Sequence, residues 1–92
     1  MAIRLVIPME AAPGKRSELV DTFRTLSPDV RKEKGCQGYE LYQSTERPDQ
    51  MVLLELWSSE EDLANHSELN RQRGLNLGPL RTGPSTAERY TV

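Results

Sequence analysis

The segment at 51–66 most constrains the fold, because it encodes a strand and a helix with almost no connection between them. Residues 51–57 are apolar except for one Glu, which is typical of a buried strand. Ser58 follows as a candidate helix N-cap, and Glu61 three residues later completes a capping box. We therefore expect a helix at 59–73. The same segment contains the only Trp and the only His of the chain.

Three further strands are expected around this segment. Residues 2–9 alternate in the manner of a strand and carry apolar side chains on both faces, which indicates a central strand. Residues 38–44 form another strand, and the turn-forming residues at 46–50 join it to the strand at 51–57 as a hairpin. Residues 86–92 form the last strand, after an irregular connection rich in Gly and Pro.

A first helix precedes the hairpin. Leu19, Phe23, Leu26 and Val30 are spaced four, three and four residues apart, which places them on one helical stripe. Pro28 falls inside this pattern and has no backbone N–H, so it predicts a kink or a new turn capped by the preceding Ser. Gly35 is the expected end of the helix.

The resulting order, β-α-β-β-α-β, is the ferredoxin-like arrangement of the α+β class, with an antiparallel sheet. The 92 residues suit a single domain spanning 1–92. Helices on one face of such a sheet leave the other face uncovered, yet both faces of the predicted strands carry apolar side chains. We therefore expect a homodimer in which the helix-free sheet face packs against a second copy.

Composition excludes several classes of partner. The net charge is −2 with both signs scattered along the chain, so there is no basic patch for nucleic acid and no polybasic signal for a membrane. No segment resembles a signal peptide or a membrane span. Cys36 is the only cysteine, so no internal disulfide forms, and a reducing cytoplasm suits the chain. We interpret Cys36 as a small apolar residue rather than a nucleophile.

The helix at 59–73 carries the candidate site. His66, Ser67 and Asn70 share a helical face with Leu63, so polar groups turn toward the sheet with it. Glu55 and Trp57, on one face of the preceding strand, form the opposing wall of a predicted small-molecule pocket. The competing interpretation is that the histidine and the tryptophan are satisfied core residues. No ligand spacing for a metal is present, and no Gly-rich phosphate loop.

The chain resembles the antibiotic biosynthesis monooxygenase family of small dimeric α+β barrel proteins. The resemblance rests on Pro13-Gly14-Lys15, on Gly35-Cys36, on Leu54-Glu55-Leu56-Trp57, and on the acidic helix start at 58–62 followed by His66. It covers roughly residues 3–73 and is more specific for the fold and the dimer than for the chemistry. Members include cofactor-independent oxygenases of anthrones, quinol oxygenases and haem-degrading enzymes.

The haem-degrading branch is the least similar to this chain. That branch has a Trp where this chain has His66 and a His where it has Asn76. It also has an Asn in the first strand, where residues 3–9 contain none. We therefore expect no haem, and the resemblance implies no metal or flavin.

What the resemblance implies is monooxygenation of a small phenol, quinol or anthrone-like substrate by molecular oxygen. His66 would remove a proton and Trp57 would stack on the substrate, with Glu55 beside them. Amide and phenol groups would bind the developing oxyanion; the candidates are Asn65, Asn70, Tyr39 and Tyr42. Two alternatives stay open: a non-catalytic module that binds a small ligand or assists another enzyme, and an isomerase or cyclase on the same scaffold.

Overall fold

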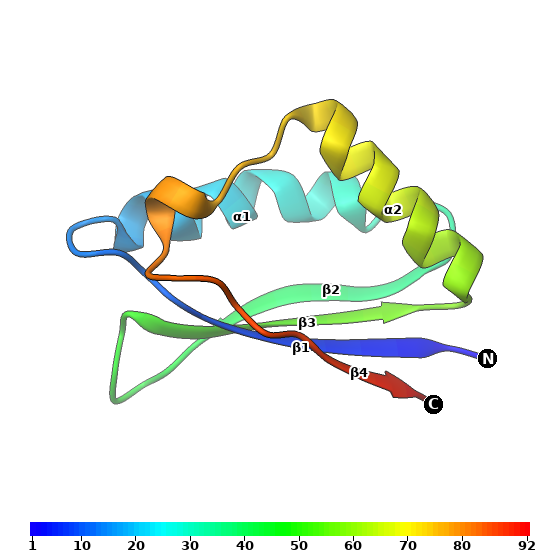
Figure 1. Ribbon diagram of the computed structural model, residues 1–92, viewed down its shortest axis with the longest axis horizontal. Helices are drawn as coiled ribbons and strands as arrows, with labels where there is room; N and C mark the ends of the chain where they lie inside the picture. The colour runs from blue at the N-terminus through cyan, green and yellow to red at the C-terminus, as the bar shows by residue number, and fades with distance from the viewer.

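The apolar segment at 51–57 lies in strand β3 (Gln50–Trp57), inside a four-stranded sheet in the computed structural model, which describes residues 1–92 (Figure 1). β3 pairs antiparallel with β1 (Ile3–Glu10) and with β2 (Cys36–Gln43). β4 (Glu88–Thr91) pairs with the other edge of β1. The strand order β2-β3-β1-β4 confirms the predicted ferredoxin-like fold and the hairpin.

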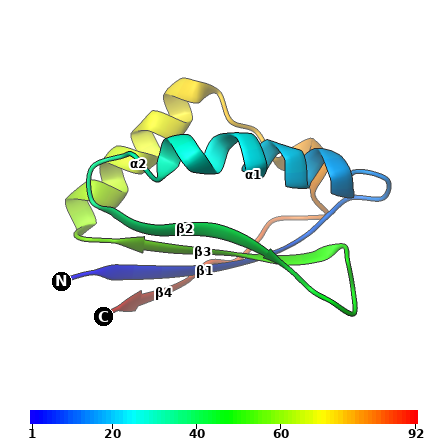
Figure 2. The ribbon, with the colours of Figure 1, turned by 180° about the vertical axis from the view of Figure 1, so that it is seen from behind.

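Both helices cover the same face of this sheet, and the opposite face carries none (Figures 1 and 2). They are α1 (Arg16–Val30) and α2 (Glu60–Arg73). The chain then runs along the helix side through one 3₁₀ turn, η1 (Gly78–Leu80), before it reaches β4. The α+β architecture expected from the sequence is confirmed.

Alternation along β3 separates the core from the helix-free face. The buried residues are Met51, Leu53, Glu55 and Trp57, and they lie under the helices with the α1 stripe. Leu19, Phe23 and Val30 of that stripe are also buried. The intervening residues Val52, Leu54 and Leu56 are only half-buried, so β3 places apolar side chains on the uncovered face of the sheet, as the sequence indicated.

The N-cap of α2 differs from the prediction by one residue. Ser59, not Ser58, caps the helix: its hydroxyl accepts from the Asp62 N–H at 3.1 Å. The Ser58 N–H instead donates to the Gly35 carbonyl at 2.9 Å, which keeps Ser58 in the chain leading out of β3. The expected capping box is therefore absent, although the acid-rich first turn remains favourable to the helix dipole.

The predicted new turn at Pro28, capped by the preceding Ser, is also wrong. α1 runs through Pro28 to Val30, and the Arg31 N–H still donates to the Ser27 carbonyl. Pro28 lies in the last turn, where the loss of one hydrogen bond ends no helix. Ser27 is a buried residue of the helix rather than a cap. Gly35 lies beyond the helix end, in the turn before β2, with φ +80°.

Candidate functional site

His66 is the centre of a buried polar cluster between α2 and the sheet. Its side chain is 5% exposed. The imidazole packs on the Trp57 indole, with ring centroids 4.5 Å apart and planes inclined by 30°. The Tyr39 ring meets the imidazole edge-on at 5.7 Å. Two aromatic rings from adjacent strands therefore enclose the only histidine.

The imidazole is hydrogen-bonded to a carboxylate that belongs to neither of the two predicted walls of the pocket. Glu33, in the connection between α1 and β2, lies with Oε1 2.8 Å from His66 Nδ1. Its side chain is 8% exposed, and its other oxygen accepts from Arg73 Nη2 at 2.8 Å. The guanidinium compensates the buried negative charge, as a buried carboxylate requires.

Asn70 completes the contacts of the imidazole. Its Nδ2 lies 3.1 Å from His66 Nε2, and its Oδ1 accepts from Arg73 Nη1 at 2.8 Å. His66, Asn70 and Arg73 lie on one stripe of α2, at offsets of four and three residues. The last turns of α2 and the α1–β2 connection are thus joined through one set of side chains.

Glu55 lies on the other side of the imidazole. Its Oε1 accepts from Trp57 Nε1 at 2.9 Å and lies 3.7 Å from His66 Nε2. Burial raises the pKa of Glu55; the Trp57 hydrogen bond and His66 lower it in part, and Glu33 raises it further. This carboxyl group therefore holds its proton to a higher pH than an exposed Glu, which suits proton transfer.

Tyr39 remains a phenol in this environment. Burial raises the pKa of Tyr39 well above its ordinary value, and the nearby carboxylates of Glu55 and Glu33 raise it further. A phenol that keeps its proton can donate a hydrogen bond to an anion, which is the role expected of it.

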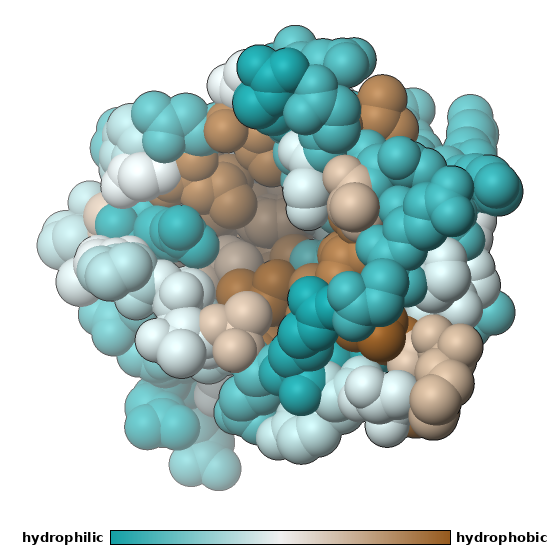
Figure 3. Space-filling model, turned by 45° about the vertical axis from the view of Figure 1, so that its right-hand side comes forward, coloured by the Kyte–Doolittle hydropathy of each residue, from teal (hydrophilic) through white to brown (hydrophobic).

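A cleft of about 400 Å³ lies on the helix side of the sheet, between α2 and β4, and no side chain of the cluster lines it. Leu5 of its wall is the cross-strand partner of Glu55, and Leu63 precedes His66 by one helical turn. Figure 3, which brings the α2 side of the molecule forward, shows hydrophobic residues gathered in a hollow between hydrophilic ones. The other lining residues come from α2, β4 and the residue before β4: Glu60, Ala64, Ser67, Ala87 and Arg89. The cleft is large enough for a small molecule, and its wall combines apolar side chains with the Arg89–Glu60 ion pair.

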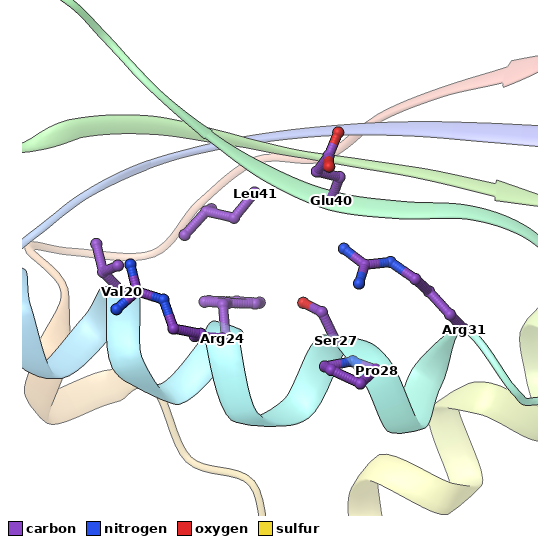
Figure 4. A pocket seen from close by; sticks show the side chains of 8 residues that line it. Val20, Arg24, Ser27, Pro28, Arg31, Glu40 and Leu41 are labelled. Atoms are coloured by element: carbon purple, nitrogen blue, oxygen red, sulfur yellow. The ribbon is translucent and has the colours of Figure 1, made fainter.

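A second groove of about 400 Å³ lies between α1 and the edge strand β2 (Figure 4). Ser27 of α1 and Arg31, just past the end of α1, point toward the side of Glu40 and Leu41 of β2, and Arg24 lies beside Val20. The groove is lined by no residue of α2, the helix that carries His66, so we leave it outside the candidate site.

Comparison with known proteins decides the family. The model of a family described as antibiotic biosynthesis monooxygenase matches residues 2–73. The chain belongs to this family. Among curated proteins, none matches the sequence. The family assignment confirms the resemblance drawn from the residues.

Solved structures agree with this assignment. A conserved protein from Methanosarcina mazei Go1 superposes with a TM-score of 0.89 at 27% identity, covering 98% of this chain and 91% of that one. Rv0793 from Mycobacterium tuberculosis gives 0.86 at 25% identity over 100% and 95% of the chains. PA3566 from Pseudomonas aeruginosa gives 0.83 at 25% identity over 97% and 91%.

Most residues predicted for the site of this antibiotic biosynthesis monooxygenase family member lie in the cluster. These are His66, Glu55, Trp57, Tyr39 and Asn70. Asn65 and Ser67 are exposed on α2. Tyr42 is 48% exposed on the helix-free face, opposite to Tyr39, because neighbouring positions of a strand alternate between faces.

Trp57 differs from its predicted role. The side chain is completely buried and packs against His66, so its ring is not open to a substrate. It instead donates to Glu55 and supports the imidazole. The sequence shows that a tryptophan stands at a strand end, but it does not show which neighbour the indole packs against.

Two members of the cluster were missed by sequence reasoning. Glu33 lies in a run of charged residues at 31–34, which looks like solvated surface, and nothing in the sequence distinguishes it from its neighbours. Arg73 was detectable, because it continues the helical stripe of His66 and Asn70. In the sequence it marked only the expected end of the helix.

The structure contains no group of three or more His, Cys, Asp or Glu side chains arranged to hold a metal ion. Neither α1 nor α2 combines the length and the apolar character of a membrane-crossing helix.

Proposed function

We propose that the protein is a cofactor-independent monooxygenase acting on a small phenol, quinol or anthrone-like molecule. Family membership supports the reaction class. The observation that carries the proposal is the buried His66 imidazole, bonded to Glu33 and flanked by Glu55. We place the activity in the cytoplasm, where Cys36 stays reduced.

The reaction requires a base, a binding site for the substrate anion and the exclusion of water. Removing a proton from the substrate gives an electron-rich anion that reacts with molecular oxygen. For an anthrone-like substrate, the methylene carbon loses two hydrogen atoms and gains one oxygen atom, and the second oxygen atom leaves as water. The substrate supplies all the electrons, so the balance needs no further reductant.

In this proposal His66 accepts the proton, with Glu33 and Asn70 fixing its orientation. Glu55 lies close enough to take part in the proton transfer. Tyr39 supplies a phenol donor for the substrate anion. Trp57 acts through Glu55 and His66 rather than by contact with the substrate. A homodimer through the helix-free sheet face completes the assembly.

Oxygen uptake tests the proposal. With reduced quinols or anthrones in an oxygen-electrode assay, we expect the protein to consume oxygen. The His66→Ala variant should lose about 10²–10⁴-fold of the rate, as for a general base. Gln72→Ala, exposed on the same helix, is the matched control and should keep the wild-type rate. Absence of uptake with every substrate, or an undiminished rate in His66→Ala, contradicts the proposal.

One observation favours a non-catalytic alternative, a module that binds a small ligand or assists another enzyme. Every buried polar side-chain atom already has a hydrogen-bond partner, as in a structural cluster. Such a module would bind a quinol in the cleft and neither change it nor consume oxygen. An isomerase or cyclase would change it without oxygen, so product analysis under anaerobic conditions separates the three functions.

A further inference from the structure

The hydrogen bonds around His66 close into a ring in which donors and acceptors have one consistent assignment. A guanidinium only donates, so the Asn70 atom 2.8 Å from Arg73 Nη1 is the amide oxygen. This fixes the orientation of the amide and turns Nδ2 toward His66 Nε2, at 3.1 Å. An amide NH₂ also only donates, so Nε2 is the acceptor and carries no proton.

The remaining hydrogen bonds of this closed set determine whether His66 Nδ1 carries a proton. Glu33 Oε2 accepts from Arg73 Nη2 at 2.8 Å, and this charge-assisted contact favours the ionised carboxylate. The remaining oxygen, Oε1, then accepts from His66 Nδ1 at 2.8 Å. The proton of the imidazole therefore lies on Nδ1, and Arg73 connects both ends of the chain of contacts.

We infer that Asn70 and Arg73 are positioning residues that hold His66 as neutral imidazole, with the proton on Nδ1 and the lone pair on Nε2. The catalytic meaning of this role rests on the proposed function: to act as a base, neutral His66 would exchange the Asn70 N–H at Nε2 for the substrate proton. Nε2 is the nitrogen that lies 3.7 Å from Glu55 Oε1.

The charges facing His66 are compatible with this state. Glu33 comes from the α1–β2 connection and is compensated by Arg73 of α2. Tyr39 of β2 is an uncharged phenol, and Glu55 of β3 is the one remaining carboxyl group. With neutral imidazole, the Glu33 carboxylate and the Arg73 guanidinium balance each other, and the raised pKa of Glu55 favours its uncharged form, which limits the cost of burying the cluster away from water.

Nitrogen-15 NMR of the resting protein tests the inference, because His66 is the only histidine and its signals need no assignment. At neutral pH we expect Nδ1 to show the chemical shift of a protonated nitrogen and Nε2 that of an unprotonated one. A spectrum of the opposite tautomer, or of imidazolium, overturns the inference without any variant.

Asn70→Asp gives the sharper test. The new carboxylate keeps an oxygen for Arg73 but places a second acceptor against Nε2, so Nε2 must gain a proton. The imidazolium fraction of His66 should rise at least about tenfold at neutral pH, as expected for an adjacent carboxylate. Asn65→Asp makes the same change on the exposed side of α2 and should leave the spectrum unchanged. An unchanged spectrum in folded Asn70→Asp overturns the inference.

Arg73→Met tests the other positioning residue. Without the guanidinium, the Asn70 amide is free to rotate and the preference for the Nδ1-protonated tautomer should fall. Arg71→Met is the matched control, because Arg71 binds only Glu68 on the surface of α2. A tautomer ratio in folded Arg73→Met equal to that of the wild type contradicts the role of Arg73. These spectra do not depend on turnover, so the expected tautomer without oxygen uptake would support the ring and count against the oxygenase alone.

Discussion

At the residue scale, the burial of Glu55 gives folding stability a measurable pH dependence. Burial raises the pKa of Glu55 in the folded protein. The unfolded chain releases this proton near the ordinary value of about 4.3, whereas the folded chain keeps it. The folded state therefore loses stability as the pH rises from that value through the raised pKa.

The isosteric Glu55→Gln variant removes this proton equilibrium and retains an oxygen for Trp57. Its free energy of unfolding should match that of the wild type near about pH 4 and exceed it at about pH 8. Urea unfolding across this range measures the difference. Glu46→Gln, in the exposed turn before β3, is the control. A difference that does not change with pH for Glu55→Gln would contradict the prediction.

Gly35 illustrates a close approach of backbone to a side chain. It adopts φ +80°, and an added Cβ would lie 2.1 Å from Asp62 Oδ2. Asp62 cannot move freely, because it is buried and accepts from the Ser58 hydroxyl at 2.5 Å. Gly35→Ala should therefore cost more than about 2 kcal/mol of unfolding free energy.

Gly14→Ala separates the two contributions to this loss. Gly14 has a similar φ of +74° but open space around the added Cβ. Only the backbone cost of about 1–2 kcal/mol should appear there. Equal losses for the two variants in urea unfolding would show that Asp62 plays no part.

At the scale of elements, α2 depends on its termini more than on an apolar face. Only Asp62, Leu63 and His66 of its residues are buried, so packing alone stabilises it weakly. The Ser59 cap, an acidic first turn and the left-handed Gly74 at its end compensate for this. By stabilising both ends of α2, these features hold the helix that carries His66 over the sheet.

Ser59→Ala should destabilise the protein by about 1 kcal/mol, because the Asp62 N–H loses its acceptor. Ser67→Ala, at an exposed position of the same helix, should change the free energy of unfolding by less than about 0.5 kcal/mol. Thermal or urea unfolding of both variants provides the comparison. A larger loss for Ser67→Ala than for Ser59→Ala would contradict the assigned cap.

At the scale of the whole molecule, we predict that a partner covers the helix-free face of the sheet. Val6, Val52, Leu54 and Leu56 lie there half-buried in one chain. The tyrosines on this face, Tyr42 and Tyr90, are 48% and 49% exposed. An apolar sheet face of this kind favours association, and we expect a second copy to cover it.

Light scattering at micromolar concentration should give twice the mass of one chain. Leu54→Arg places a charge between Val6 and Glu40 at the middle of this face and should reduce the mass to that of one chain. Leu69→Arg is the control, because Leu69 is 39% exposed on α2, away from the sheet face. A wild-type mass of one chain would contradict the dimer.

Much of the fold was predictable because it depends on local periodicity. The alternation of side chains along residues 51–57 predicts a strand and its buried face, and the apolar stripe from Leu19 to Val30 predicts a helix and its buried face. Element boundaries were less certain: the choice between Ser58 and Ser59 as cap depends on a hydrogen bond from Ser58 to Gly35, which lies far away in sequence. His66 and Asn70 were predictable as a pair, because helical spacing fixes their common face.

Only the tertiary structure decided what these residues contact. Glu33 reaches His66 across 33 positions of sequence, and Arg73 reaches Glu33 across 40. Trp57 was expected to stack on a substrate, but in the folded chain its ring packs against His66. The amino-acid pattern alone was enough to predict the elements and their faces, since these follow from residues two apart in strands and three or four apart in helices. The partners of each polar group were decided by folding, because they come from segments that meet only when the sheet and both helices are assembled.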